Sequence, residues 1–254
     1  MKHDFIDRYS KLESPVHALD PRAKAIALFA LIIVCVTTPP GAWWAFCVYA
    51  GVVVIIAAAS RIPVRYLLSR VLIVLPFILM VAVFIPFMHK GGASYDLGPF
   101  AVSSEGLLVL WNVAVKSTIS VSCLILLSST TPFPNLMHGF ERLHVPSFFT
   151  TVAAFMYRYI FVIVDEAQRM KRACESRNFR GRWIWQARTV GYMVASLFLR
   201  SHDRAERVYQ AMCARGFDGT FPLQRESRMR AADYIFLSVV VLTVLAGRLV
   251  ILWK

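Results

Sequence analysis

The chain has 254 residues, of which 57% are hydrophobic, and its mean hydropathy is +0.57. These values exclude an ordinary soluble domain, because the apolar residues also form long runs. The formal net charge is +13. Since the basic residues stand beside apolar segments, they indicate the anionic lipids of a cytoplasmic membrane face and not a nucleic acid.

Five segments are apolar enough to cross a bilayer, which requires roughly 20 residues with a usable range of about 17–25. They are Ala23–Thr38, Ala42–Ala59, Val71–Met88, Gly106–Ser129 and Ala232–Leu252. We therefore predict an all-α polytopic membrane protein. Four spanning helices lie in residues 1–130, a basic cytoplasmic region occupies residues 131–230, and the fifth spanning helix lies in residues 231–254.

Basic residues predict the orientation of these segments. Arg22 and Lys24 stand at the start of the first segment, and Arg61, Arg65 and Arg70 lie before the third. Residues 131–230 carry 16 Lys and Arg against 8 Asp and Glu, a net charge of +8. The positive-inside rule then predicts an N-terminus inside, two external connections and a C-terminus outside.

The basic cytoplasmic region has its own helical pattern. Apolar residues recur every three or four positions after Pro146 and again from Val190 to Met212, and the later half of each run becomes basic. Trp183 and Trp185 lie between the two runs, where amphipathic rings suit a membrane interface. We predict two long amphipathic helices.

Each of these helices ends in a repeated segment. Asp165–Gly181 reads DEAQRMKRACESRNFRG and Asp203–Gly219 reads DRAERVYQAMCARGFDG, with seven identities at an offset of 38 residues. The matched pairs include Arg177 with Arg215. A membrane protein that contains the same helix end twice is expected to offer it to a paired partner.

Capping chemistry predicts the shape of both ends. Gly216 and Asn178 suit the left-handed C′ position, and the hydrophobic residue after each, Phe217 or Phe179, is expected to pack back on the last turn. The arginine before each cap is then fixed on the final turn. It either complements its own helix dipole or projects toward a partner carboxylate in a bidentate bond.

The triplets Ser176-Arg177-Asn178 and Ala214-Arg215-Gly216 resemble the two Ala-Arg-Gly-type motifs of energy-coupling-factor transporters. They mark the T component, the transmembrane scaffold of those importers. The opening segment Ser14–Leu28 is also similar to the N-terminus of that family, with its Asp-Pro-Arg-x-Lys element at Asp20 to Lys24. The closest type is CbiQ, from cobalt and nickel importers.

The resemblance implies a scaffold in a bacterial cytoplasmic membrane that pairs with two ATPase subunits and a substrate-binding membrane subunit. Arg177 and Arg215 would each seat in an ATPase groove, and ATP with Mg²⁺ would bind to the partners, so that this chain holds no cofactor. Ser176 and Asn178 depart from the Ala and Gly of the motif. Whether the two ATPase contacts are equally strong stays open.

Lys116 is a charged residue in the middle of a predicted span, and such residues are costly and often functional. It could face a cavity, a backbone carbonyl or a partner subunit. Lys116-Ser117-Thr118 is not a phosphate loop, because Leu110 and Val115 stand where that motif requires glycine.

No catalytic or metal-binding residues are predicted. The six histidines are scattered, and none are four residues apart as in a helical metal site. Three alternatives stay open: a self-contained secondary permease, a membrane-bound enzyme acting on lipid, and a T component for a vitamin in place of cobalt or nickel. The permease would need ionisable residues along several spans.

Overall fold

The computed structural model describes residues 14–83, 94–97, 100–177, 183–217, 219 and 229–252. The chain forms two compact units. The first, here the membrane unit, combines Lys2–Gly139 with Ser227–Lys254, and the second, here the two-helix unit, is Phe140–Glu226. Both are helical, and the only strands in the described ranges are two of four residues each, so the prediction of an all-α membrane protein is confirmed.

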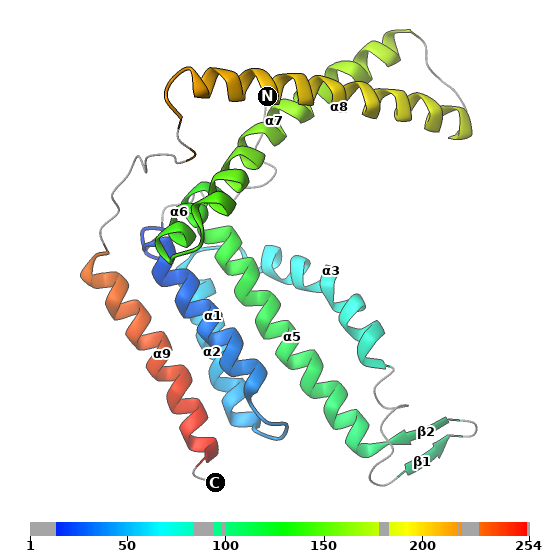
Figure 1. Cartoon of the computed structure of the whole chain (residues 1–254). Helices are drawn as coiled ribbons and strands as arrows, with labels where there is room; N and C mark the ends of the chain where they lie inside the picture. Colours follow the sequence, from blue (N-terminus) through cyan, green and yellow to red (C-terminus); the bar gives the residue numbers. More distant parts are fainter. Residues whose placement is uncertain are drawn as a thin grey trace. The chain divides into compact units, whose positions relative to one another are not determined.

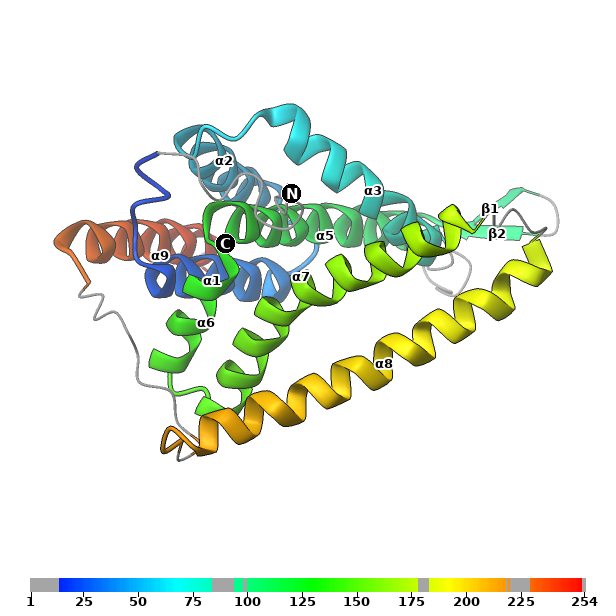
Figure 2. The same cartoon turned by 90° about the horizontal axis from the view of Figure 1, so that it is seen from above.

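Five helices of the membrane unit fall at the five predicted spans. They are α1 (Pro21–Thr37), α2 (Trp43–Ala59), α3 (Val64–Val83), α5 (Ser104–Thr130) and α9 (Ala231–Leu252). Helix α5 contacts α1, α2 and α3, while α9 contacts α1 and α2, although it is last in the chain (Figures 1 and 2). The final helix therefore packs against the first two helices of the chain.

Length and composition alone do not single out these five helices. Among the described residues, three stretches are long and apolar enough to cross a membrane: Leu108–Thr130, Ser147–Ser176 and Ala231–Arg248. Helix α2 is apolar but has 17 residues, and Ser147–Ser176 lies in the region predicted to be cytoplasmic. The orientation and the cytoplasmic position of residues 131–230 stay predictions.

The third span begins earlier than predicted. Helix α3 starts at Val64, directly after Pro63, so Arg65 and Arg70 lie in its first two turns and not in a loop. The guanidinium carbon of Arg70 lies 5.3 Å from the centroid of the Tyr66 ring. A long basic side chain can cover apolar surface in this way and keep its charge at the interface, so the helix continues through both arginines.

Two further elements were not predicted. The connection before α5 contains an antiparallel hairpin of β1 (Ser94–Leu97) and β2 (Phe100–Ser103). After α5, a ten-residue helix α6 (Phe133–Arg142) carries the chain out of the membrane unit. Both are short segments that lack the long apolar run on which the span prediction depends.

The two-helix unit consists of α7 (Ser147–Ser176) and α8 (Trp183–Cys213), which contact each other. Helix α7 begins after Pro146 as predicted. Helix α8 begins at Trp183, so the prediction that Trp183 and Trp185 lie between the helices is wrong. An ion pair of 2.6 Å between Arg200 Nη1 and Glu166 Oε1 joins the helices.

Candidate coupling site

The end of α8 has the predicted capping geometry. Gly216 has a φ of 79°, in the left-handed region. Its N–H donates to the carbonyl of Cys213 at 3.0 Å, and the N–H of Phe217 donates to the carbonyl of Met212 at 3.1 Å. These two bonds define a Schellman motif, with Gly216 at C′ and Phe217 at C″. The backbone after Ala214 is thus fixed, and Arg215 is exposed on it.

The end of α7 is described as far as its own arginine. Arg177 is the C-cap, has a φ of −87°, and donates its N–H to the carbonyl of Cys174 at 3.2 Å. The hydroxyl of Ser176 donates to the carbonyl of Ala173 at 3.0 Å. Asn178 and Phe179 lie outside the described residues, so the predicted left-handed cap at Asn178 stays a prediction.

Both motif arginines have exposed side chains. In the described ranges of the two-helix unit, Arg200 pairs with Glu166 and Lys171 pairs with Glu175. Neither involves Arg177 or Arg215. The guanidinium groups at the two helix ends are therefore available to an external carboxylate, whereas Arg200 is used within the chain.

The two ends are far apart along α8. Cys174, one turn before Arg177, places its Sγ 3.6 Å from Sδ of Met193. From Met193 to Arg215, a helix rises roughly 33 Å at 1.5 Å per residue. The two arginines are therefore too far apart to bind the same carboxylate.

Lys116 has a structural partner at the end of α1. Its Nζ donates to the carbonyls of Thr38 at 2.6 Å and Val36 at 2.9 Å, and it lies 6.0 Å from the Phe46 ring centroid. Arg248 of α9 donates to the hydroxyl of Thr37 at 2.9 Å. Two cations thus complement the carbonyl end of α1, as the helix dipole favours. Of the predicted alternatives for Lys116, the structure supports the backbone carbonyl.

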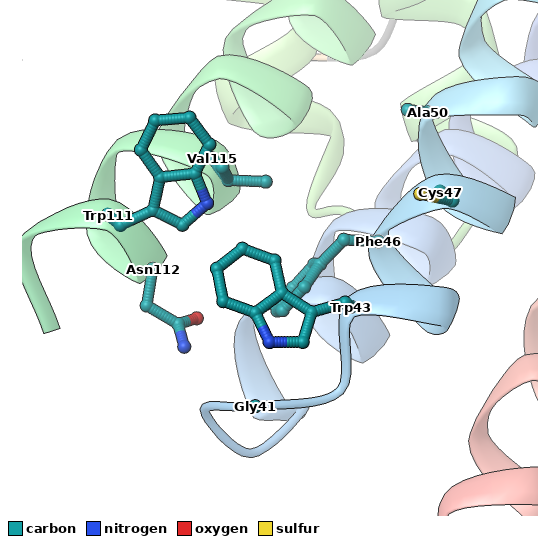
Figure 3. Close-up of a pocket in the computed structure, with 8 residues that line it drawn as sticks. All are labelled: Gly41, Trp43, Phe46, Cys47, Ala50, Trp111, Asn112 and Val115. Carbon is teal, nitrogen blue, oxygen red and sulfur yellow. The ribbon is translucent and has the colours of Figure 1, made fainter. Parts of the chain in front are cut away.

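A cavity of about 220 Å³ opens beside this region, between α2 and α5. Aromatic and small side chains line it together with the carboxamide of Asn112 (Figure 3); its residues are Gly41, Trp43, Phe46, Cys47, Ala50, Trp111, Asn112 and Val115. Lys116 is not part of this lining. The cavity is suited to an apolar group, not to acid–base chemistry.

A buried polar cluster lies at the other end of the bundle, and no pattern in the sequence predicts it. Asp20, Lys24 and Asp233 are 6%, 2% and 3% exposed. Asp20 and Lys24 lie at the start of α1, and Asp233 lies in the first turn of α9. The Asp20 to Lys24 element was noted for its resemblance to the T-component family. Its partner Asp233 is more than 200 residues away in sequence, so no local pattern could join them.

Metal-binding groups do not gather in the described ranges, where no three His, Cys, Asp or Glu residues could hold an ion. Cys35 and Cys123 are buried, and Cys47 and Cys213 are exposed. The expectation that this chain binds no metal or cofactor stays a prediction.

Comparison with known proteins gives a family model described as "Cobalt transport protein", CbiQ, which matches residues 13–227. The energy-coupling factor transporter transmembrane protein EcfT of Heliobacterium modesticaldum is 28% identical over 271 aligned positions, covering 100% of this chain and 98% of the relative. EcfT of Ruminiclostridium cellulolyticum is 27% identical, covering 89% and 88%. A putative fused cobalt transport protein CbiMQ of Methanocorpusculum labreanum is 25% identical, covering 85% of this chain and 37% of the fusion.

Proposed function

Because the chain belongs to the CbiQ family of cobalt transport proteins, whose relatives include transmembrane components of energy-coupling-factor transporters, we propose that its two-helix unit docks two ATPase subunits. The chain is a transmembrane energy-coupling subunit. In this proposal the partners bind ATP and Mg²⁺, and a separate membrane subunit binds the cargo. Movement of the ATPases reaches that subunit through α7 and α8.

One observation carries the docking proposal: the repeated helix ends each carry an exposed arginine, Arg177 and Arg215, and neither arginine is part of the Arg200–Glu166 or Lys171–Glu175 pair. A guanidinium has a planar fork of donors that binds a carboxylate through two parallel bonds. The Schellman motif after Ala214 holds one of these forks on a rigid backbone. Each arginine would enter one groove, on one ATPase subunit.

We propose cobalt as the cargo, with nickel as a second metal of the same importer type. The description of the family model and the name of the fused CbiMQ relative support cobalt. The EcfT relatives support the coarser role of a transporter component, and a vitamin is the alternative cargo. Uptake of radioactive cobalt, nickel and candidate vitamins by cells with and without the chain distinguishes these cargoes.

The proposed location is a bacterial cytoplasmic membrane with the N-terminus inside and the C-terminus outside. The basic cluster of residues 131–230, with a net charge of +8, supports this orientation through the positive-inside rule. Labelling of single introduced cysteines from each side of the membrane tests it.

The central experiment replaces both motif arginines, Arg177→Glu with Arg215→Glu, and measures copurification of the ATPase from native membranes. Loss of one partner from a buried charge pair costs about 2–5 kcal/mol, so the double variant should lose the ATPase while still inserting in the membrane. Unchanged association would mean that both arginines only complete their own helix ends.

The repeat supplies a matched control. Arg169 and Arg207 occupy equivalent positions eight residues before the motif arginines, and both are exposed. The variant Arg169→Glu with Arg207→Glu makes the same change in charge on the same two helices, and it should retain the ATPase. Purification of a chain that transports without an ATPase would support the secondary permease instead.

A further inference from the structure

The buried polar cluster at the start of α1 joins segments that are distant in the sequence. One carboxylate oxygen of Asp233 accepts a hydrogen bond from the N–H of Asp20 at 2.7 Å, and the other accepts one from the N–H of Arg230 at 2.7 Å. The carboxylate of Asp20 in turn accepts the N–H of Arg22 at 2.9 Å. Asp233 thus binds the beginning of α9 to the beginning of α1.

Lys24 extends this cluster to the end of α5. Its Nζ donates to the carbonyl of Thr130 at 3.2 Å and to the carbonyl of His17 at 3.4 Å. The charge of Lys24 also interacts with those of Asp20 and Asp233. The ammonium group complements the carbonyl end of α5, as the carboxylates complement the N–H ends of α1 and α9.

The cluster lies where the two-helix unit is connected to the membrane unit. On the outgoing side, Thr130 ends α5, and the chain leaves the membrane unit after Gly139. On the returning side, the chain re-enters the membrane unit at Ser227, three residues before Arg230. Both covalent connections therefore reach α1 through hydrogen bonds of the same few residues.

A close contact on the outgoing side is the third place where a connection meets the start of α1. A Cβ at Gly139 would lie 3.3 Å from Cβ of Pro21, so α6 passes the first turn of α1 with little free space. Thr130, Gly139 and Asp233 are thus all held against the segment from Asp20 to Lys24.

Stability alone is a weak reason for such a cluster. Burial of charged groups is costly, and well-packed apolar residues often replace a buried ion pair without loss of stability. Buried charges do fix a specific arrangement of elements, because each must keep its hydrogen-bond partners. Such a fixed arrangement is useful where helices must keep their relative positions while force acts on them.

We infer that Asp20, Lys24 and Asp233 are positioning residues for energy coupling. They hold the outgoing and returning connections of the two-helix unit on α1, so that movement of α7 and α8 displaces the membrane helices. Without these three residues, the two connections would move independently of α1, and movement of α7 and α8 would not displace the membrane helices. This inference rests on the proposed function, because it requires ATPases that drive the two-helix unit.

The test uses the full complex with its ATPase and substrate-binding subunits, reconstituted in liposomes, and measures cargo uptake per ATP hydrolysed. For Lys24→Met and Asp233→Asn, we expect ATPase association and ATP hydrolysis within about twofold of the unmodified complex. Uptake per ATP should fall at least tenfold. Lys24→Arg, which keeps a donor and the charge, should restore much of the uptake.

Lys116→Met is the matched control. Lys116 also donates to two backbone carbonyls of the α1 region, but at the opposite end of that helix. If the cluster acts only through stability, the two lysine variants should behave alike. We expect Lys116→Met to lower the melting temperature and to leave uptake per ATP within about twofold in complexes that assemble.

The outcomes separate this inference from the proposed function. If the unmodified chain recruits no ATPase, the proposed function fails. If it does recruit ATPases and uptake per ATP is unchanged in Lys24→Met and Asp233→Asn, the positioning role is wrong. Should these variants not assemble, Gly139→Ala is the second test, because its methyl group would lie 3.3 Å from Cβ of Pro21 and press α6 away from the first turn of α1. Normal uptake per ATP in that variant also overturns the inference.

Discussion

The substitution Gly216→Ala isolates the backbone geometry of the second docking end. Gly216 has a φ of 79°, and a Cβ added there would meet no atom within 4 Å. Steric conflict with neighbours therefore contributes nothing, and the cost is that of a left-handed alanine, about 1–2 kcal/mol. Relief of this cost requires the last turn of α8 to unwind, with loss of the hydrogen bonds that Gly216 and Phe217 donate.

The expected effect on binding follows from this cost. If the ATPase recognises Arg215 only on the capped end, a penalty of about 1–2 kcal/mol weakens its affinity roughly 5- to 30-fold, since 1.4 kcal/mol is a factor of ten. Gly216→Asn should weaken it less, because asparagine adopts the left-handed conformation more readily. The affinity of the detergent-solubilised chain for the purified ATPase, measured by thermophoresis, checks both values.

Gly191→Ala provides the control for Gly216→Ala. Gly191 lies inside α8, and a Cβ there also meets no atom within 4 Å. Alanine is favoured over glycine by up to about 1 kcal/mol in a helix interior, so this variant should stabilise α8 and leave ATPase affinity unchanged. An affinity for Gly216→Ala within twofold of the unmodified chain would refute the view that the capped end is the recognised form.

Two further substitutions test local features of the two-helix unit. His144 has a φ of 66°, and its N–H donates to the carbonyl of Glu141 at 3.2 Å. The substitution His144→Gly should relieve about 1 kcal/mol of backbone strain and raise the melting temperature. A lower melting temperature would contradict this. The ion pair of Arg200 with Glu166 leaves the arginine side chain 59% exposed, so a double-mutant cycle with alanine at both positions should give a coupling energy of about 0.2–1 kcal/mol. A coupling above that range would mean that the pair is protected from solvent in the membrane-bound chain.

Local signals in the sequence were enough for the helices and for one helix end. The apolar runs placed all five span helices, and Gly216 followed by Phe217 predicted a Schellman motif that the backbone hydrogen bonds reproduce. In both cases the structure depends on residues within a few turns of each other. The docking role of Arg177 and Arg215 is of another kind, because it concerns a partner, and it stays a prediction.

What the sequence did not predict depends on distant or competing interactions. The start of α3 was placed too late because Arg65 and Arg70 look like loop residues until the covering of Tyr66 by Arg70 is seen. The sequence did not show what Lys116 contacts, because its carbonyl partners lie about 80 residues away. The contact of Asp20 with Asp233 spans 213 residues, and neither residue carries a local pattern that identifies the other.

The same contact has a consequence for biosynthesis. At roughly 5–20 residues per second, a ribosome needs about 10–40 s to proceed from Asp20 to Asp233. During that time α1 is already made, yet the carboxylate that binds the N–H of Asp20 does not exist. The membrane bundle is therefore completed only when α9 is inserted, and a nascent chain that stops before Ser227 leaves buried charges without their final partner.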